Sequence, residues 1–372
     1  MLYNMCVIYK ITCKLRFQNQ GEIVMKNVKK TLGIVVTVAA IAVAGSIFVS
    51  VSGVTRSDKI QLKMSHNQSK DSEIADCIAK VAEFAAEDPS MNLEVDIYAS
   101  GVLGTEQSAV EMVKAGVLDM AKVSSSMIGQ FNDCYSIFSL PYLFTSEEHY
   151  YEAMEKSEKV KELFKMNEED GFLVIGYYAN GSRNIYLKED VKADNPSVLK
   201  GKKIRSMTSS TSMRMLELMG ASPTPMAASE TYTALQQGIV DGAENTELAL
   251  TVDKHAEVAK SYTYTEHQYT PDVYIISTKT WNKLSKEQQE FLVECLNRSN
   301  ENFKSLYRNM MEEAIEEAKG MGMNIYYDID KTAFIEAVQP LHQEYTQKGE
   351  FYKELYDDIQ KYAGEDSHED SK

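Results

Sequence analysis

Three polar residues follow apolar segments of the chain and could bind an acid. Arg183 lies in NGSRN, directly after the apolar run 172–178, Arg205 ends GKKIR, and Asn245 ends IVDGAEN. A guanidinium offers a planar pair of N–H donors that matches a carboxylate, and an asparagine amide can donate or accept beside it. Because open α/β sheets bind ligands at the carboxyl ends of strands, the pattern indicates a carboxylate site. Taken alone, each arginine is more typical of a surface or salt-bridge residue, since spacing does not prove that these residues converge.

The sequence lacks the motifs that carry most enzyme chemistry. No GxGxxG, GxxxxGK[ST], GxSxG, HExxH or EF-hand pattern occurs, the six histidines lie in different segments, and the cysteines form no CxxC pair. Nucleotide, nucleophilic and metal sites therefore lack their usual signatures. We expect no catalytic residue, no metal and no cofactor.

Composition narrows the class of protein further. The chain has 372 residues, of which 44% are hydrophobic, and a formal charge of −16. This apolar content excludes a disordered or collagen-like chain. The basic residues are scattered, whereas a nucleic-acid surface needs them clustered, so we expect no nucleic-acid partner.

The N-terminal part differs from the rest in charge and hydropathy. Residues 1–53 carry six Lys and Arg residues against the single acidic residue Glu22, and the run 32–54 contains no charged residue. An apolar run of this length behind a basic leader predicts a signal peptide or an uncleaved membrane anchor, although a buried core helix is the alternative. We expect export to the periplasm or the outer face of the cytoplasmic membrane. Met25 begins a conventional signal by itself, so residues before it are read as an upstream extension.

Hydrophobic periodicity in the remaining chain predicts an α/β fold. Strands are expected at 60–64, 93–97, 118–123, 172–178, 203–205, 240–245 and 274–276, and helices at 74–85, 110–116, 212–219 and 229–237. The uninterrupted apolar run 172–178 is typical of a strand buried on both faces of a parallel sheet.

One long amphipathic helix is expected near the C-terminus. Ser285 and Gln288 form an S-x-x-Q capping box, and apolar residues recur at helical spacing as far as Gly320. A helix of this length spans about 50 Å, so it could brace two lobes. The alternatives are a simple surface helix or a break near Asn300.

Five strings then become recognisable together: LGTEQSAVEMVKAGVLDMAKV, FSLPYLF, LKGKKIR, GASPTPM and ETYTALQQGIVDGAEN. They resemble the solute-binding proteins of tripartite ATP-independent periplasmic (TRAP) transporters, in order from about Ile60 to Tyr345. The resemblance implies a two-lobed α/β periplasmic-binding-protein architecture with mixed sheets. The lobes would close around a small organic acid in the cleft between them, without covalent chemistry, and deliver it to the small and large membrane subunits.

The expected organisation assigns 58–180 plus 271–310 to lobe I and 181–270 plus 311–362 to lobe II. Residues 363–372 are polar and charged and are expected to form a disordered tail. We expect the protein to act as a monomer.

The resemblance also implies roles for individual residues. Arg205 occupies the family motif whose arginine forms the main salt bridge with the substrate carboxylate, and Arg183 and Asn245 match two further residues that line the site. The strings LKMSHNQSKD, AKVSSSM and TEHQYTPDVYIIS resemble the branch that binds sugar acids such as hexuronates. His66 and Glu106 are therefore expected to contact ligand hydroxyls. Their alternatives are a loop-capping histidine and a glutamate favoured by the helix dipole.

Departures from the family pattern leave the ligand open. Ser124 stands where sialic-acid binders carry an acidic residue, which disfavours that ligand, and Thr208, a further expected ligand contact, replaces a common Asn. Thr246 follows the DGAEN motif in place of Pro or Asn, and Ala227 and Ala228 replace an aromatic residue. A C4-dicarboxylate or another organic acid remains an alternative ligand. Two other functions, a sensory binding protein and a secreted enzyme of sugar acids, also remain.

Overall fold

The structure, a computed structural model, describes residues 59–364. The predictions for the N-terminal segment 1–53 and for most of the tail 363–372 lie outside these residues. Within 59–364, no helix combines the length and the apolar character needed to cross a bilayer.

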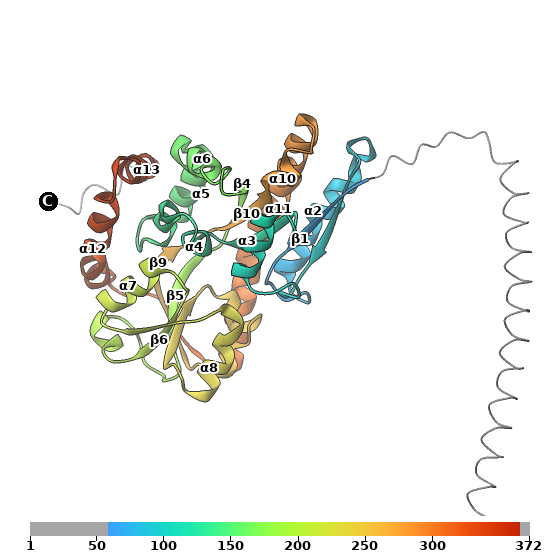
Figure 1. Ribbon diagram of the computed structural model, residues 1–372. Coiled ribbons are helices and arrows are strands. Elements are labelled where there is room, and N and C mark those ends of the chain that lie inside the picture. The colour runs from blue at the N-terminus through green and yellow to red at the C-terminus, as the bar shows by residue number, and fades with distance from the viewer. Residues whose placement is uncertain (1–58, 365–372) are drawn as a thin grey trace, which may run out of the picture. The chain divides into compact units, whose positions relative to one another are not determined.

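The described chain forms two mixed β-sheets with helices packed around them (Figure 1). The first sheet, in the order β2-β1-β3-β10-β4, contains β1 (Ile60–Ser65), β2 (Leu93–Tyr98), β3 (Met120–Ser124), β4 (Phe172–Tyr178) and β10 (Asp272–Ser277). The second sheet, in the order β11-β9-β5-β8-β6-β7, contains β5 (Ser182–Leu187), β6 (Lys203–Ser206), β7 (Ser222–Pro225), β8 (Gly242–Asn245), β9 (Ser261–Tyr269) and β11 (Asn324–Tyr326). The α/β prediction is confirmed.

Helices follow most of these strands, and they have the following bounds: α2 (Glu73–Glu87), α3 (Glu106–Ala115), α4 (Ser125–Ile128), α5 (Glu147–Lys156), α6 (Glu158–Lys165), α7 (Ser210–Leu218), α8 (Thr231–Gln237), α9 (Leu248–Thr251), α10 (Thr278–Trp281), α11 (Lys286–Gly320), α12 (Thr332–Thr346) and α13 (Glu350–Gln360). Local signals set several ends. Thr105 caps α3 by accepting from the Ser108 N–H, and Gly116, at φ 71°, closes it in the left-handed conformation. This cap fixes the start of α3 and hence the place of Glu106.

The long helix predicted near the C-terminus is confirmed without a break. Helix α11 has 35 residues and begins with the capping box of Ser285 and Gln288. It packs against α2 and against β4 of the first sheet, and also against α9 and against β11 of the second sheet (Figure 1). One rigid element therefore contacts both halves of the described chain.

Two predictions about the strands around Arg183 are wrong. The strand 172–178 is not part of a parallel sheet, because β4 is an edge strand that pairs antiparallel with β10. Its apolar character arises because α6 and α11 cover it. Arg183 does not lie at the carboxyl end of that strand but within a strand of its own, β5, which pairs antiparallel with β8 and β9.

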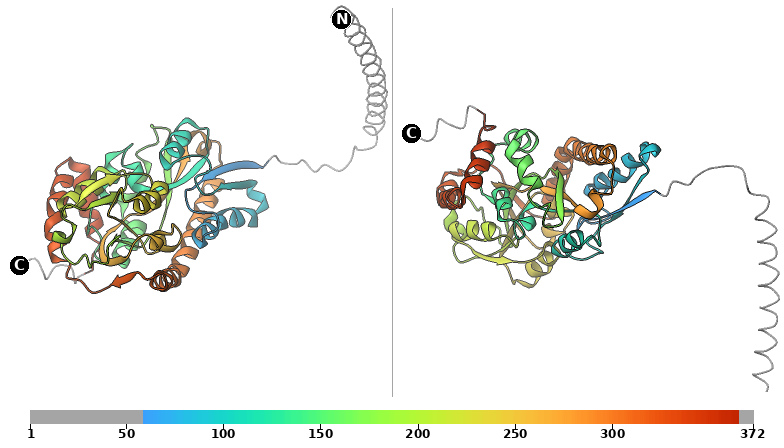
Figure 2. Two further views of the ribbon diagram at one scale, coloured as in Figure 1. Left: turned by 90° about the horizontal axis from the view of Figure 1, so that it is seen from below. Right: turned by 45° about the horizontal axis from the view of Figure 1, so that its top comes forward.

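The C-terminal helices close one end of the described chain, opposite β1, β2 and α2 (Figure 2). Helix α13 packs against α5 and α6, and α12 packs against α7. The expected division assigned 311–362 to lobe II, yet these helices contact segments assigned to both lobes. The lobe boundaries stay a prediction.

We predict that Phe303→Ala in α11 lowers the free energy of unfolding by about 3–5 kcal/mol, because it opens a cavity in the core. The Phe303 side chain is 1% exposed, and its ring centroid lies 4.7 Å from that of Tyr178 and 5.2 Å from that of Tyr307. Urea denaturation measures the change. Leu306→Ala is the control on the same helix: Leu306 is 41% exposed, so its loss should stay below about 0.5 kcal/mol. Equal losses in the two variants would contradict this packing.

Candidate functional site

Arg183 is almost fully bonded to the neighbouring strand. Its Nε donates to Glu244 Oε2 (2.5 Å), and its Nη2 donates to Glu244 Oε1 (3.1 Å) and to the Glu244 carbonyl (2.8 Å). Its Nη1 donates to Asn245 Oδ1 (2.9 Å). A guanidinium has five N–H donors, so four bonds leave one for a further partner. Strands β5 and β8 produce this pairing, since Asn184 lies opposite Asn245 in the register.

Glu244 neutralises the charge of Arg183. Burial by itself would raise the pKa of the Glu244 carboxyl, but the Arg183 charge and the hydrogen bonds from His267 and Arg183 together outweigh it and lower that pKa to about 2. Both side chains are buried. The pair therefore acts as a built-in ion pair beneath the site and contributes no net charge.

Arg205 is the opposite case. It lies in β6, is 4% exposed, and donates a hydrogen bond from Nη2 to the Met226 carbonyl (2.9 Å). Its Nε has no partner, and among residues 59–364 no carboxylate lies within ion-pair distance of it. Burial lowers its pKa, yet an arginine stays protonated in proteins. The second sheet thus holds a buried cation without a protein counter-ion.

Asn245 and Thr208 are placed differently from one another. The Asn245 Oδ1 accepts from Arg183 Nη1 and from the Thr246 N–H (2.9 Å each), which leaves its amide N–H groups free to donate. Thr208 is exposed. Its hydroxyl and its carbonyl accept from Gln130 Nε2 at 2.9 and 2.7 Å. Asn245 therefore lies beside the arginines, whereas Thr208 is occupied by a contact to the segment after α4.

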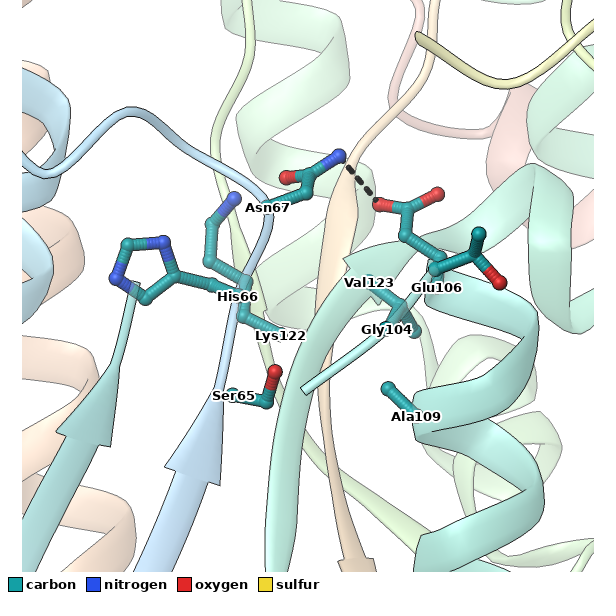
Figure 3. Close-up of a pocket in the computed structure, with 9 residues that line it drawn as sticks. Ser65, His66, Asn67, Gly104, Glu106, Ala109, Lys122 and Val123 are labelled. Carbon is teal, nitrogen blue, oxygen red and sulfur yellow. Dashed lines mark hydrogen bonds between the residues drawn. The ribbon is translucent and has the colours of Figure 1, made fainter. Parts of the chain in front are cut away.

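Glu106 lies at the carboxyl end of the first sheet, in a small cavity lined also by His66, Asn67 and Lys122 (Figure 3). Its Oε1 accepts from Asn67 Nδ2 (3.1 Å) and from the Ser124 N–H (3.2 Å). Burial, and next the charge of Asp272, raise the pKa of this carboxyl to about 7.

His66 does not join Glu106. Figure 3 shows Asn67 and Glu106 turned toward one another and the His66 ring turned away from them. Its Nδ1 is buried and has no partner. Burial, and then the Lys122 charge, lower the pKa of the imidazole to about 3, so the ring is neutral at neutral pH.

The site has two half-sites, one around Arg183, Arg205 and Asn245 in the second sheet and one in the cavity of Glu106 at the first sheet, and the segments beside them are in contact. Ser126 Oγ donates to Met207 Sδ (3.3 Å), and Gln130 bonds to Thr208, so the segments after β3 and after β6 are in contact. The charge of Arg205 is also close enough to lower the pKa of Glu106. These contacts bring Arg205 and the cavity of Glu106 close together.

Sequence reasoning missed two groups of functional interest: Glu244, the partner of Arg183, and the buried pair of Lys122 and Asp272. Lys122 is 1% exposed and its Nζ bonds to Asp272 Oδ2. The sequence does carry a signal for these residues. Glu244, Lys122 and Asp272 are each a single charge beside apolar strand residues, and a charge buried there needs a partner.

Among the described residues, no group of His, Cys, Asp and Glu side chains could hold a metal ion. Cys77, Cys134 and Cys295 are free and buried.

Comparison with known proteins decides the class. Residues 64–348 match the family described as bacterial extracellular solute-binding protein, family 7. The chain belongs to this family. It is also 38% identical over 289 residues to the uncharacterized protein YiiZ of Salmonella typhimurium, covering 77% of this chain and 87% of that protein.

Solved TRAP periplasmic solute-binding proteins share the fold. The protein from Anaerococcus prevotii, with bound D-glucuronate, is 34% identical with a TM-score of 0.78, covering 82% of this chain and 98% of that one. The protein from Sulfitobacter, with bound β-D-galacturonate, is 28% identical with a TM-score of 0.76, covering 81% and 100%. The expected periplasmic-binding-protein architecture is confirmed.

Membership in family 7 defines the general role of the chain. Proteins of this family are extracytoplasmic, bind small organic acids and work with TRAP membrane subunits. This solute-binding protein is therefore a transport component and not an enzyme.

We predict that Glu244→Gln lowers the free energy of unfolding by about 3–5 kcal/mol, because it leaves Arg183 as a buried, unpaired cation. Urea denaturation at neutral pH measures the loss. Glu189→Gln is the matched control: Glu189 pairs with Lys202 at 2.7 Å but its side chain is 67% exposed, so the loss should be below about 1 kcal/mol.

The pH dependence gives a second test of the same pair. The pKa of Glu244 is about 2 in the folded protein against 4.5 ordinarily, so between these values the unfolded chain binds more protons. The pair's contribution to stability is therefore complete above pH 4.5 and is lost as the pH falls toward 2. Wild type should lose more stability than Glu244→Gln over this window. Parallel curves would contradict the pairing.

Proposed function

We propose that this solute-binding protein captures a sugar acid, of the hexuronate type, by pairing the ligand carboxylate with Arg205. The observation that carries the proposal is the buried Arg205 guanidinium, which has no carboxylate partner among the described residues. A buried charge is costly unless it is paired. A carboxylate offers two acceptor oxygens to the N–H groups that Arg205 has left.

The neighbours of Arg205 support the same ligand. Asn245 has amide N–H groups free to donate, and Arg183 retains one N–H. On the facing side, Glu106 and the uncharged His66 suit hydroxyl groups rather than apolar surface. Two solved relatives have glucuronate or galacturonate bound. Each of these ligands carries both kinds of group, a carboxylate and several hydroxyls.

We also propose how binding is coupled to delivery. The ligand bridges elements of the two sheets, so both half-sites contact it only when the lobes are closed, and the ligand shifts the equilibrium toward that state. Thr208 contributes through its bond to Gln130 at the meeting point rather than through the ligand. The protein acts as a monomer that presents the closed form to the TRAP membrane subunits.

We predict that Arg205→Met weakens binding of D-glucuronate by about 2–5 kcal/mol, because it removes the counter-charge of the carboxylate. Isothermal titration calorimetry measures the affinity. The uncharged methyl ester of glucuronate should bind wild type as weakly as glucuronate binds the variant. Arg214→Met is the matched control, since Arg214 is an exposed arginine of α7 and its loss should leave the affinity unchanged.

Stability without ligand separates a binding role from a structural one. Arg205→Met should leave the free energy of unfolding unchanged or raise it, because the variant no longer buries an unpaired cation. Arg183→Met should lower it, because Glu244 would be left unpaired. If Arg205→Met keeps wild-type affinity for every uronate, aldonate and C4-dicarboxylate that raises the melting temperature of wild type, the proposal is wrong.

A further inference from the structure

The net charge of the cavity at the end of β1 follows from the charged and titratable side chains around it. Lys122 and Asp272 are both buried and pair with each other, so their charges cancel. His66 is neutral at neutral pH because its pKa lies near 3. Glu106 is hydrogen-bonded by uncharged donors, the Asn67 amide and the Ser124 N–H. When Glu106 is ionised, this half-site therefore carries one uncompensated negative charge.

The hydrogen bonds of the cavity leave an acceptor free and its donors engaged. Asn67 and Ser124 direct their N–H groups to Oε1 of Glu106, which leaves Oε2 as an acceptor without a partner among the described residues. Lys122 Nζ bonds to Asp272 and lies 4.8 Å from the ring centroid of Tyr178, so its charge is compensated within the protein. The cavity thus favours a hydrogen-bond donor such as a hydroxyl, and it repels another carboxylate.

The size of the cavity agrees with this preference. Its free volume is about 10 Å³, close to the minimum of ~10–15 Å³ that holds one water molecule. A single hydroxyl matches that space, whereas a carboxylate brings two oxygens and a charge. Figure 3 shows the Glu106 carboxylate and the Asn67 amide together at this edge of the sheet.

We propose that Glu106 is a specificity-determining residue that restricts the ligand to acids with one carboxylate, whose far end carries hydroxyls. Lys122 and Asp272 are the positioning pair that keeps the rest of the cavity neutral. This inference rests on the proposed function, because it requires the first carboxylate to occupy Arg205. It sets sugar monoacids such as hexuronates apart from the corresponding sugar diacids and from C4-dicarboxylates.

The test compares D-glucuronate with D-glucarate, the diacid of the same carbon skeleton, by calorimetry at about pH 8.5, where a carboxyl with the raised pKa of Glu106 is ionised. Wild type should bind glucuronate at least ~100-fold more tightly than glucarate, the size expected for like charges in a partly buried site. Glu106→Gln should narrow this ratio at least ~10-fold, because it removes the repelling charge and retains the shape. The difference between a ring and an open chain is the same for both proteins, so the change in the ratio reports the charge.

Two variants separate charge from other effects. Glu111→Gln removes an exposed carboxylate from the same helix and should leave the ratio as in wild type. Glu106→Asp keeps the charge, so it should keep the ratio even if both affinities fall. Circular dichroism establishes that each variant is folded.

The outcomes separate this inference from the proposed function. The inference is supported if the preference for glucuronate over glucarate falls in Glu106→Gln and is retained in Glu106→Asp and Glu111→Gln. The inference is overturned if wild type binds glucuronate tightly and glucarate equally well. It is also overturned if the ratio of the glucuronate affinity to the glucarate affinity is unchanged in Glu106→Gln. Both results leave the proposed function intact. Failure of wild type to bind any sugar acid overturns both.

Discussion

The site depends on one electrostatic imbalance, a guanidinium buried in the second sheet without a protein counter-ion. Arg205 is as deeply buried as Arg183, but Arg183 has Glu244 opposite it and Arg205 has no carboxylate within ion-pair distance among the described residues. The two arginines therefore contribute differently. Arg183 stabilises the fold and orients Asn245, whereas Arg205 stores an unfavourable burial energy that an anion can relieve.

The strands around these residues explain why the arrangement is rigid. Arg183 and Asn245 lie on paired strands, and Arg205 lies on β6, which pairs with β8. Side chains held by a sheet lose little freedom when a ligand arrives, so less of the interaction energy is spent on ordering them. The cost is that both sheets carry buried charges, which Glu244 compensates for Arg183 in the second sheet and Asp272 compensates for Lys122 in the first.

The sequence predicted regular elements better than pairings. Helix α11 and its capping box were recognisable because caps and helical periodicity are local signals, and so was the end of α3 at Gly116. Strand β5 was missed, since ANGSRN has the composition of a loop and its strand is formed by partners distant in the sequence. The direction of β4 could not be read either, because an apolar run records burial and not whether its neighbour runs parallel or antiparallel.

For the candidate site too, the sequence indicates individual residues but not their pairings. Arg205, Arg183 and Asn245 were singled out by motif, but motifs do not reveal that Glu244 neutralises one arginine and leaves the other unpaired. Likewise, the motifs single out Glu106 but do not reveal that Lys122 and Asp272 pair with each other nearby. Net charge at a site is a property of contacts between distant segments, so it becomes visible only in the folded chain.

The contact between Gln130 and Thr208 has a kinetic consequence. The contact joins the segments that follow β3 and β6, and Arg205 is 4% exposed; under the proposed function, a carboxylate would enter and leave through a state in which these segments are separated. The lifetime of the proposed complex would then reflect how often the segments separate as well as the strength of the proposed ion pair. A partner that pulls these two segments apart would release the ligand without competing for the arginine.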